Sequence, residues 1–165
     1  MKIEYSVLDC SFGKVTVATT EQGICCVSFA EDAEKELTHR FRKAILANHE
    51  NSLHRTVVEL LNEWPASAGK AAELPLHLMG TEFQQAVWKA LLTLKPGDLT
   101  SYKSIALKTG RPTAIRATGT AIGQNPVAVF VPCHRVLTSS GKIGGYRWGT
   151  PLKVFLIEKE GKNSG

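Results

Sequence analysis

The residues that start and stop helices about halfway along the chain are the feature that most limits its fold. Thr81, with Gln84 three residues later, forms a capping box and predicts the start of a helix. A second helix is predicted over residues 101–109, because Gly110 stands where a glycine commonly ends a helix. A third is predicted over residues 112–123, with a proline in its first turn. Two short helices joined by a tight glycine-containing turn indicate a helix-turn-helix.

The third of these helices consists mainly of small residues, and it carries one long side chain, Arg116. A helix with so little bulk can bring its backbone close to another surface. One interpretation is close packing against a neighbouring element of the core. The other is insertion into the narrow minor groove of DNA, with the long side chain of Arg116 pushed into that groove. The small residues and the threonines among them are Ala114, Ala117, Thr118, Gly119, Thr120 and Ala121.

Charge is distributed unevenly between the two halves of the chain. Residues 1–80 hold 8 Lys/Arg and 11 Asp/Glu, whereas residues 81–165 hold 12 Lys/Arg and 4 Asp/Glu. No acidic residue occurs between Asp98 and Glu158. A long basic stretch without acids is typical of a surface that faces a polyanion such as DNA. The alternative is the solvated surface of a basic protein, since charge alone does not identify a partner.

Three short strands separated by glycine-containing turns are predicted in the first 30 residues. They cover residues 3–8, 14–19 and 24–29 and indicate an antiparallel meander. Two charged helical segments are predicted next, at residues 31–47 and 52–64. The first half of the chain is therefore expected to form a sheet accompanied by helices.

The boundary between the two halves is predicted from a stretch that lacks helical or strand periodicity. Residues 65–80 are punctuated by proline, glycine and small residues, as in a linker. We therefore expect an N-terminal domain over residues 1–75, a linker over 76–80 and a C-terminal domain over 81–165. The expected fold class is α+β, with an N-terminal antiparallel β-sheet lobe with helices and a mostly helical C-terminal lobe that carries the helix-turn-helix.

A cysteine and a histidine stand side by side after a short apolar run. Residues 126–131 have valines at alternate positions, which predicts a buried strand that ends close to Cys133 and His134. A thiol is nucleophilic as its thiolate, and an imidazole brought round by a turn, or reached through a water, can accept its proton. Glu160, predicted in the last turn of the final helix, is a candidate to orient that imidazole. The alternative is a buried cysteine that acts as a small apolar residue.

The sequence also argues against several classes of protein. No apolar run approaches the roughly 18 residues of a membrane span, and the first residues lack the apolar core of a signal peptide. We therefore expect a cytoplasmic protein with no membrane partner. The cysteines show no paired spacing, so neither a bound metal nor a disulfide framework is predicted. They are Cys10, Cys25, Cys26 and Cys133.

Several segments of the second half form one recognisable pattern. They are residues 83–88, 100–102 and 114–117, Asn125-Pro126, Pro132-Cys133-His134-Arg135-Val136, and residues 144–149. Together they resemble the O6-alkylguanine-DNA alkyltransferase family, also called methylated-DNA–protein-cysteine methyltransferases. The resemblance is strong over residues 81–161 and loose over residues 1–30. It implies that the N-terminal lobe is ribonuclease H-like and the C-terminal lobe winged-helix-like.

The resemblance also implies a chemistry and a role for each matching residue. Cys133 would take an alkyl group from O6 of a flipped-out guanine and keep it, so that each molecule reacts once. His134 would remove the thiol proton through a water, and Glu160 would complete the triad. Asn125 would brace the turn that carries the cysteine. Tyr102 would crowd a DNA phosphate and hydrogen-bond the extruded base.

The implied partner is double-stranded DNA that contains O6-alkylguanine, bound by a monomer without cofactor or metal. Arg116 would fill the gap that the flipped base leaves in the stack. Further DNA contacts are implied for Ala117, Thr118 and Arg135. The base pocket would be formed by Val136, Gly145, Tyr146 and Lys153. Whether O4-alkylthymine is also accepted stays open.

Three other functions compete with this one. A binding-only relative would recognise alkylguanine without repairing it, but such relatives lack the cysteine that Cys133 provides. A helix-turn-helix regulator would leave the same cysteine merely buried, although no dimerisation element is evident. A hydrolase with a Cys-His-Glu triad would need an oxyanion hole, for which no motif is evident.

Overall fold

The computed structural model describes residues 1–164, and their contacts form two compact units. The first unit contains Met1–Leu78 together with Pro126–Ala128, and the second contains Met79–Asn125 and the chain from Val129 onwards. The domain limits expected from the sequence do not include this return of a short segment to the first unit. In the part of the chain that the structure describes, no helix is long and apolar enough to cross a membrane.

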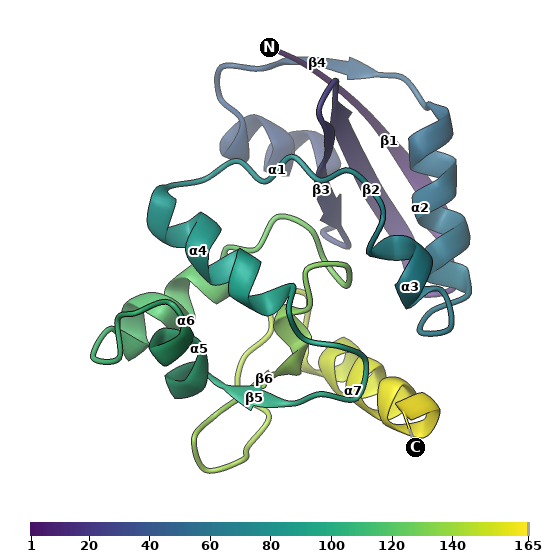
Figure 1. The fold of residues 1–165 in the computed structure, drawn as a ribbon. Coiled ribbons are helices and arrows are strands. Elements are labelled where there is room, and N and C mark those ends of the chain that lie inside the picture. The colour runs from purple at the N-terminus through teal and green to yellow at the C-terminus, as the bar shows by residue number, and fades with distance from the viewer. Residues whose placement is uncertain (165) are drawn as a thin grey trace. The chain divides into compact units, whose positions relative to one another are not determined.

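The first unit is built on a four-stranded sheet (Figure 1). β1 (Lys2–Cys10), β2 (Gly13–Thr20) and β3 (Gly23–Ser28) are joined by short turns and pair antiparallel, so the predicted meander is confirmed. β4 (Ile45–Asn48) pairs in parallel with β1 and gives the order β3-β2-β1-β4. This fourth strand was not predicted from the sequence.

The segment predicted as one helix over residues 31–47 is divided between a helix and a strand. α1 (Ala33–Arg40) starts after Asp32, whose carboxylate accepts a backbone N–H of the first turn at 3.0 Å. The chain then turns into β4, where the Ile45 N–H donates to the Met1 carbonyl at 2.8 Å. The helical prediction is wrong after α1, because pairing with β1 satisfies the backbone there and outweighs local helix propensity.

The other helices of the first unit follow β4. α2 (Ser52–Asn62) lies close to the predicted limits and packs against β1 and β2. α3 (Ala68–Ala71) is a short helix inside the stretch expected to be irregular. The chain then runs beside β3, where the Ile24 N–H donates to the Pro75 carbonyl at 2.9 Å and the His77 N–H donates to the Ile24 carbonyl at 2.8 Å. This pairing covers the edge of the sheet at β3.

His54 of α2 is fully buried, and both of its ring nitrogens are hydrogen-bonded. Ser6 Oγ lies 2.7 Å from Nδ1, and Thr19 Oγ1 lies 3.1 Å from Nε2. The Asn51 N–H also donates to Nδ1, at 3.5 Å, as part of the capping box that starts α2. Nδ1 therefore acts as an acceptor and Nε2 carries the proton, which holds the imidazole in its neutral form.

We expect acid to destabilise the first unit through His54. Burial lowers the pKa of this imidazole below its usual value of 6.5, so protonation favours the unfolded chain. The contribution of neutral His54 to stability is present above pH 6.5 and is lost as the pH falls below it. Urea unfolding between about pH 7.5 and 5 should show a larger loss for the wild type than for His54→Gln, which itself costs about 1–3 kcal/mol at the higher pH. Equal losses in the two proteins would contradict this role.

The second unit contains the predicted helix-turn-helix. α4 (Glu82–Leu91) starts at the predicted capping box, in which the Gln84 N–H donates to Thr81 Oγ1 at 3.1 Å and the Thr81 N–H donates to Gln84 Oε1 at 2.9 Å. α5 (Tyr102–Lys108) ends just before Gly110, whose φ of 77° is the left-handed conformation that glycine adopts readily. The starts of both helices and the end of α5 are therefore close to the predicted positions.

α6 (Ile115–Gly123) is the helix predicted to recognise DNA, and it starts three residues later than expected. The preceding residues form a turn, closed by the Ala114 N–H donating to the Arg111 carbonyl at 2.9 Å. The indole Nε1 of Trp88, which is buried in α4, donates to the Ala121 carbonyl at 2.9 Å. This bond fixes the end of α6 against α4.

Residues 126–131 are buried but do not form the predicted strand. Within this segment Val127 makes an isolated parallel bridge to β3, and turns occupy the residues that follow. Val129 has a φ of 70°, which a β-branched residue rarely adopts. The amide of Asn125 holds the turn by donating from Nδ2 to the Val131 carbonyl at 2.7 Å. The alternating valines indicated burial correctly, but a buried turn gave the same pattern as a strand.

The remaining elements place the chain around Cys133. A 3₁₀ helix, η1 (Cys133–Arg135), leads into β6 (Val136–Leu137), which pairs in parallel with β5 (Thr100–Ser101). α7 (Thr150–Ser164) packs against η1. Because α7 continues to Ser164, Glu160 lies before its last turn and not in it, as the sequence had suggested.

Candidate active site

Cys133 is the first residue of η1, and its side chain is 5% exposed. Its Sγ accepts a hydrogen bond from Asn125 Nδ2 at 3.2 Å. The same amide nitrogen donates to the Val131 carbonyl, so one buried side chain at the end of α6 holds both the turn and the sulfur. This arrangement agrees with the bracing role expected for Asn125.

His134, which follows Cys133 on η1, forms a buried pair with Glu160 of α7. His134 Nε2 lies 2.6 Å from Glu160 Oε2. The other carboxylate oxygen, Oε1, accepts the Nε–H of Arg135 at 2.7 Å. Because the carboxylate accepts, Nε2 carries the proton and Nδ1 is left as the basic nitrogen. Nδ1 is buried and has no hydrogen-bond partner among the residues described.

The charges in this pair follow from burial and from the partners. Burial opposes ionisation of Glu160, but the hydrogen bonds and charges of His134 and Arg135 outweigh it and hold the pKa at about 2. Burial lowers the pKa of His134, and the carboxylate opposes this only in part. The resting pair is therefore a neutral imidazole beside an ionised carboxylate.

The thiol of Cys133 is held in the protonated form at rest. Burial raises its pKa to about 11, while the Asn125 amide and the charge of Lys153 act in the opposite direction. A thiol with this pKa forms little thiolate at neutral pH. Nucleophilic attack by this sulfur would therefore need a base nearby, and the neutral imidazole of His134 follows Cys133 on η1.

Two of the residues expected to contact DNA are placed elsewhere by the structure. Arg135 is 3% exposed, and besides binding Glu160 it donates from one terminal nitrogen to the Leu94 carbonyl at 2.7 Å. Thr118 is completely buried in α6. The expectation that these two side chains contact DNA is wrong, because neither reaches the surface. Arg135 instead anchors the carboxylate of Glu160.

Lys153 supports the pocket from behind. Its buried ammonium group donates to the Val136 carbonyl at 2.7 Å and to the Gly145 carbonyl at 3.0 Å. These bonds join α7 to β6 and to the loop that contains Gly145. Lys153 and Val136 were both expected in the base pocket, but neither lines the cavity at Cys133. Lys153 instead holds the segments that carry the residues of the cavity wall.

Cys133 opens into a cavity of about 250 Å³ inside the second unit. Gly145 and Tyr146, which the resemblance placed in the base pocket, line it, and so does Tyr102, for which the resemblance implied a hydrogen bond to the extruded base. The phenol oxygen of Tyr146 is buried without a hydrogen-bond partner among the residues described, and its ring packs edge-on against Trp148. The lining residues that sequence reasoning missed are Gly119, Ile122, Gly123 and Arg147. Three of these follow the helical spacing of α6, which is a signal that could have found them.

Tyr102, which lines this cavity, approaches the backbone of two glycines. A Cβ added to Gly119 would lie 3.5 Å from its ring, and one added to Gly144 would lie 3.3 Å from its hydroxyl. Gly144 also has a φ of 71°, where a side chain is strained. On α6, Arg116 and Ala117 are exposed, as a contact with DNA requires.

Both units match models of one protein family. Residues 3–64 match the domain described as "6-O-methylguanine DNA methyltransferase, ribonuclease-like domain". Residues 82–162 match the one described as "6-O-methylguanine DNA methyltransferase, DNA binding domain". The two matches together cover most of the chain.

Individual relatives agree with this assignment. The chain is 36% identical to the Escherichia coli bifunctional transcriptional activator/DNA repair enzyme Ada, over 99% of this chain and 47% of Ada. It thus spans about half the length of that relative. It is 34% identical to a methylated-DNA–protein-cysteine methyltransferase of Methanosarcina barkeri, over 96% of this chain and 98% of the relative.

A solved structure shows the same fold. The crystal structure of Mycobacterium tuberculosis OGT in complex with DNA superimposes with a TM-score of 0.76 at 35% identity, covering 96% of this chain and 93% of that one. The α+β fold class predicted from the sequence is confirmed. The chain belongs to the 6-O-methylguanine DNA methyltransferase family.

Proposed function

We propose that this protein repairs O6-alkylguanine in double-stranded DNA by transferring the alkyl group to Cys133, once per molecule. The observation that carries the proposal is a buried thiol that opens into a cavity, with an amide donor on its sulfur and a His134–Glu160 pair behind it. Relatives named methylated-DNA–protein-cysteine methyltransferases support the same reaction.

The proton of Cys133 leaves through His134. The imidazole and the thiol are neighbours on η1, but no direct hydrogen bond joins them, and Nδ1 is the buried nitrogen that can accept a proton. A water between Sγ and Nδ1 would bridge the two groups in a polar site of this kind. Glu160 then stabilises the imidazolium, in the way a carboxylate orients and supports a catalytic histidine.

The transfer itself is a displacement at the alkyl carbon. Cys133 Sγ forms a bond to that carbon while the carbon–O6 bond breaks, and guanine leaves with the bonding electrons. The proton that His134 removed from Cys133 passes to the leaving base, and a hydrogen bond from Tyr102 stabilises the negative charge that develops on it. The products are guanine and a thioether. Because no side chain here can break the thioether, the protein is consumed in the reaction.

The buried position of O6 in a duplex requires that the nucleotide is rotated out of the helix. The cavity at Cys133 is smaller than the roughly 300–1,000 Å³ of sites for drug-sized ligands, which suits a single base. Arg116 is exposed on α6 and can occupy the gap left in the stack. The basic second half of the chain supplies attraction to phosphates that is independent of sequence.

The same chemistry sets the other requirements of the protein. The alkyl group comes from the DNA, so the reaction needs no cofactor. All residues of the proposed triad come from one chain, so we propose that a monomer is the active form. Cys133 must stay a free thiol, which fits the reducing cytoplasm.

The proposal is tested by incubating the protein with a short duplex that contains one O6-methylguanine, followed by intact-mass measurement and peptide mapping. We expect the mass to rise by one methylene, to saturate at one per protein, and to map to Cys133. Cys10, Cys25 and Cys26 serve as internal controls in the same digest. A protein that binds the duplex and gains no mass would be a recognition or regulatory protein instead.

A further inference from the structure

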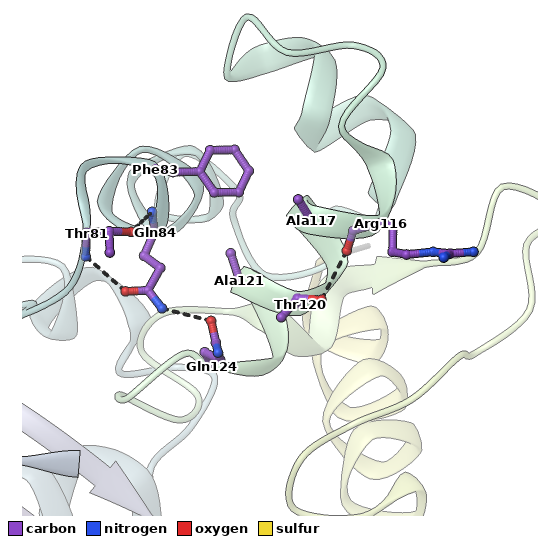
Figure 2. Close-up of a pocket in the computed structure, with 8 residues that line it drawn as sticks. All are labelled: Thr81, Phe83, Gln84, Arg116, Ala117, Thr120, Ala121 and Gln124. Carbon is purple, nitrogen blue, oxygen red and sulfur yellow. Dashed lines mark hydrogen bonds between the residues drawn. The ribbon is translucent and has the colours of Figure 1, made fainter.

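A second hollow lies in the same unit, between α4 and α6. Its volume is about 610 Å³, and its lining comes from the first turn of α4 and from the length of α6. Figure 2 shows the Phe83 ring, Ala117 and Ala121 on its apolar side and Gln84 and Gln124 at its polar end. We call this hollow the α4–α6 groove. None of its lining residues lines the Cys133 cavity.

The helical spacing of α6 places the groove and the cavity on opposite sides of one helix. Successive residues of an α-helix are about 100° apart. Residues at positions 119, 122 and 123 therefore share the side that lines the cavity, and those at 117, 121 and 124 share the side that lines the groove. Arg116, which also borders the groove, falls between the two sets. In Figure 2 its side chain extends away from Phe83 and Gln84, as expected for a residue that projects outward from α6 between the groove and the cavity.

The lining of the groove matches the chemistry of a DNA backbone. Its alanines and Phe83 offer an apolar surface to deoxyribose, and the Thr81 hydroxyl and the second amide hydrogen of Gln84 can donate hydrogen bonds to phosphate oxygens. No Asp or Glu is among the lining residues, and the nearest acid in sequence, Glu82, is not one of them. The Arg111 guanidinium lies 5.2 Å from the centre of the Phe83 ring and adds a positive charge at this side.

The polar end of the groove is already held in place. Gln84 Nε2 donates to Gln124 Oε1 at 2.8 Å, while Gln84 Oε1 accepts the Thr81 N–H of the capping box. The Trp88 bond to the Ala121 carbonyl fixes the same stretch of α6 from beneath. A preformed site of this kind needs little rearrangement to bind a ligand.

We infer that the α4–α6 groove seats the backbone of the DNA strand that does not carry the lesion. This inference rests on the function proposed above. Suppose that the side of α6 that carries Arg116 enters the minor groove and that the damaged nucleotide turns into the cavity at Cys133. The damaged strand then lies on the cavity side of Arg116. The opposite strand bounds the other wall of the minor groove, so it lies on the side of Arg116 where the α4–α6 groove is found. The groove therefore distinguishes duplex from single-stranded substrates.

Placing a negative charge in the groove tests this inference. Gln84→Glu keeps the capping box, because glutamate serves there as well as glutamine, and Gln124→Glu adds the charge from α6. Gln22→Glu, on the exposed turn between β2 and β3, is the control of equal charge. Two quantities are measured for each variant: the affinity for an undamaged duplex, and the transfer rate from O6-methylguanine in a duplex and in a single strand at limiting protein.

We expect both groove variants to bind the undamaged duplex about tenfold more weakly at low salt, with a smaller difference at high salt. Transfer from the duplex should fall by a similar factor, while transfer from the single strand changes less than about twofold. The control should match the wild type throughout. Unchanged duplex affinity, or equal losses with both substrates in variants that melt normally, would overturn the inference. A wild type that binds the duplex and transfers nothing would instead refute the proposed function, and the affinity measurement would still test the groove.

Discussion

Replacing Cys133 by alanine is expected to abolish alkyl transfer while leaving DNA binding intact. The sulfur is the atom that forms the new bond, and removing a covalent nucleophile costs more than about 10⁴-fold in rate. Cys133 is only 5% exposed, so its loss removes little surface that could contact the duplex. The affinity for a duplex with one O6-methylguanine should therefore stay within about twofold of the wild type. Intact-mass kinetics and fluorescence anisotropy measure the two quantities separately.

Cys25→Ala is the matched control for this experiment. Cys25 is also buried, and burial raises its pKa to about 12, but it lies on β3 in the first unit. Each substitution removes one buried sulfur and should cost about 1 kcal/mol in stability. The control should still gain one methyl group per molecule. Transfer that survives in Cys133→Ala would refute the assignment of the acceptor.

Replacing Glu160 by glutamine is expected to weaken both folding and chemistry. The change keeps the size of the side chain but removes the charge that Arg135 and His134 share. Breaking a buried ion pair leaves the remaining charge uncompensated and typically costs about 3–5 kcal/mol. For a chain of this size that corresponds to a melting temperature lower by roughly 10 °C. The transfer rate at 25 °C should fall about 100-fold, the scale of losing an effective proton acceptor.

A second substitution separates these two effects. Arg135→Met, added to Glu160→Gln, removes the uncompensated charge and should recover much of the lost stability. It should not recover the transfer rate, because the imidazole still lacks its carboxylate. If stability and rate return together, Glu160 contributes only to the fold and the proposed relay is refuted.

The same carboxylate predicts how stability depends on acid. Glu160 has a pKa of about 2 in the folded protein, below its ordinary value of 4.5. Its ionisation therefore stabilises the folded state above about pH 4.5, and this contribution is lost as the pH falls toward 2. Unfolding measured across this range should show a smaller acid-dependent loss in Glu160→Gln than in the wild type.

Local sequence signals predicted most of the helical half correctly. The capping box at Thr81 and Gln84 and the glycine at position 110 identified helix ends that the structure confirms. These signals work because a cap or a left-handed glycine acts on the few residues beside it. The same reasoning failed for residues 31–47 and 126–131. In both segments the backbone is satisfied by partners far away in the sequence, which outweigh local preference.

The residues that come together in the site were predicted, but the position of one of their neighbours, Arg135, was not. Cys133, His134, Asn125 and Glu160 come together, as the family resemblance implied. A contact of Arg135 with DNA was implied by the family resemblance. Its true position depends on Glu160, which is 25 residues away in the sequence, and on the Leu94 carbonyl, which is 41 residues away.

The sequence by itself determined the periodic burial of the helices, the caps that start or end several of them, the meander of β1 to β3 and the presence of a cysteine beside a histidine. These properties depend on neighbours within a few residues, so the order of residues is enough to specify them. Only the tertiary structure decided which nitrogen of His134 is free, which cation neutralises Glu160, and that α6 separates two hollows. Each of these depends on groups brought together from distant segments, because the partner of a buried charge and the space beside a helix exist only once the chain has folded.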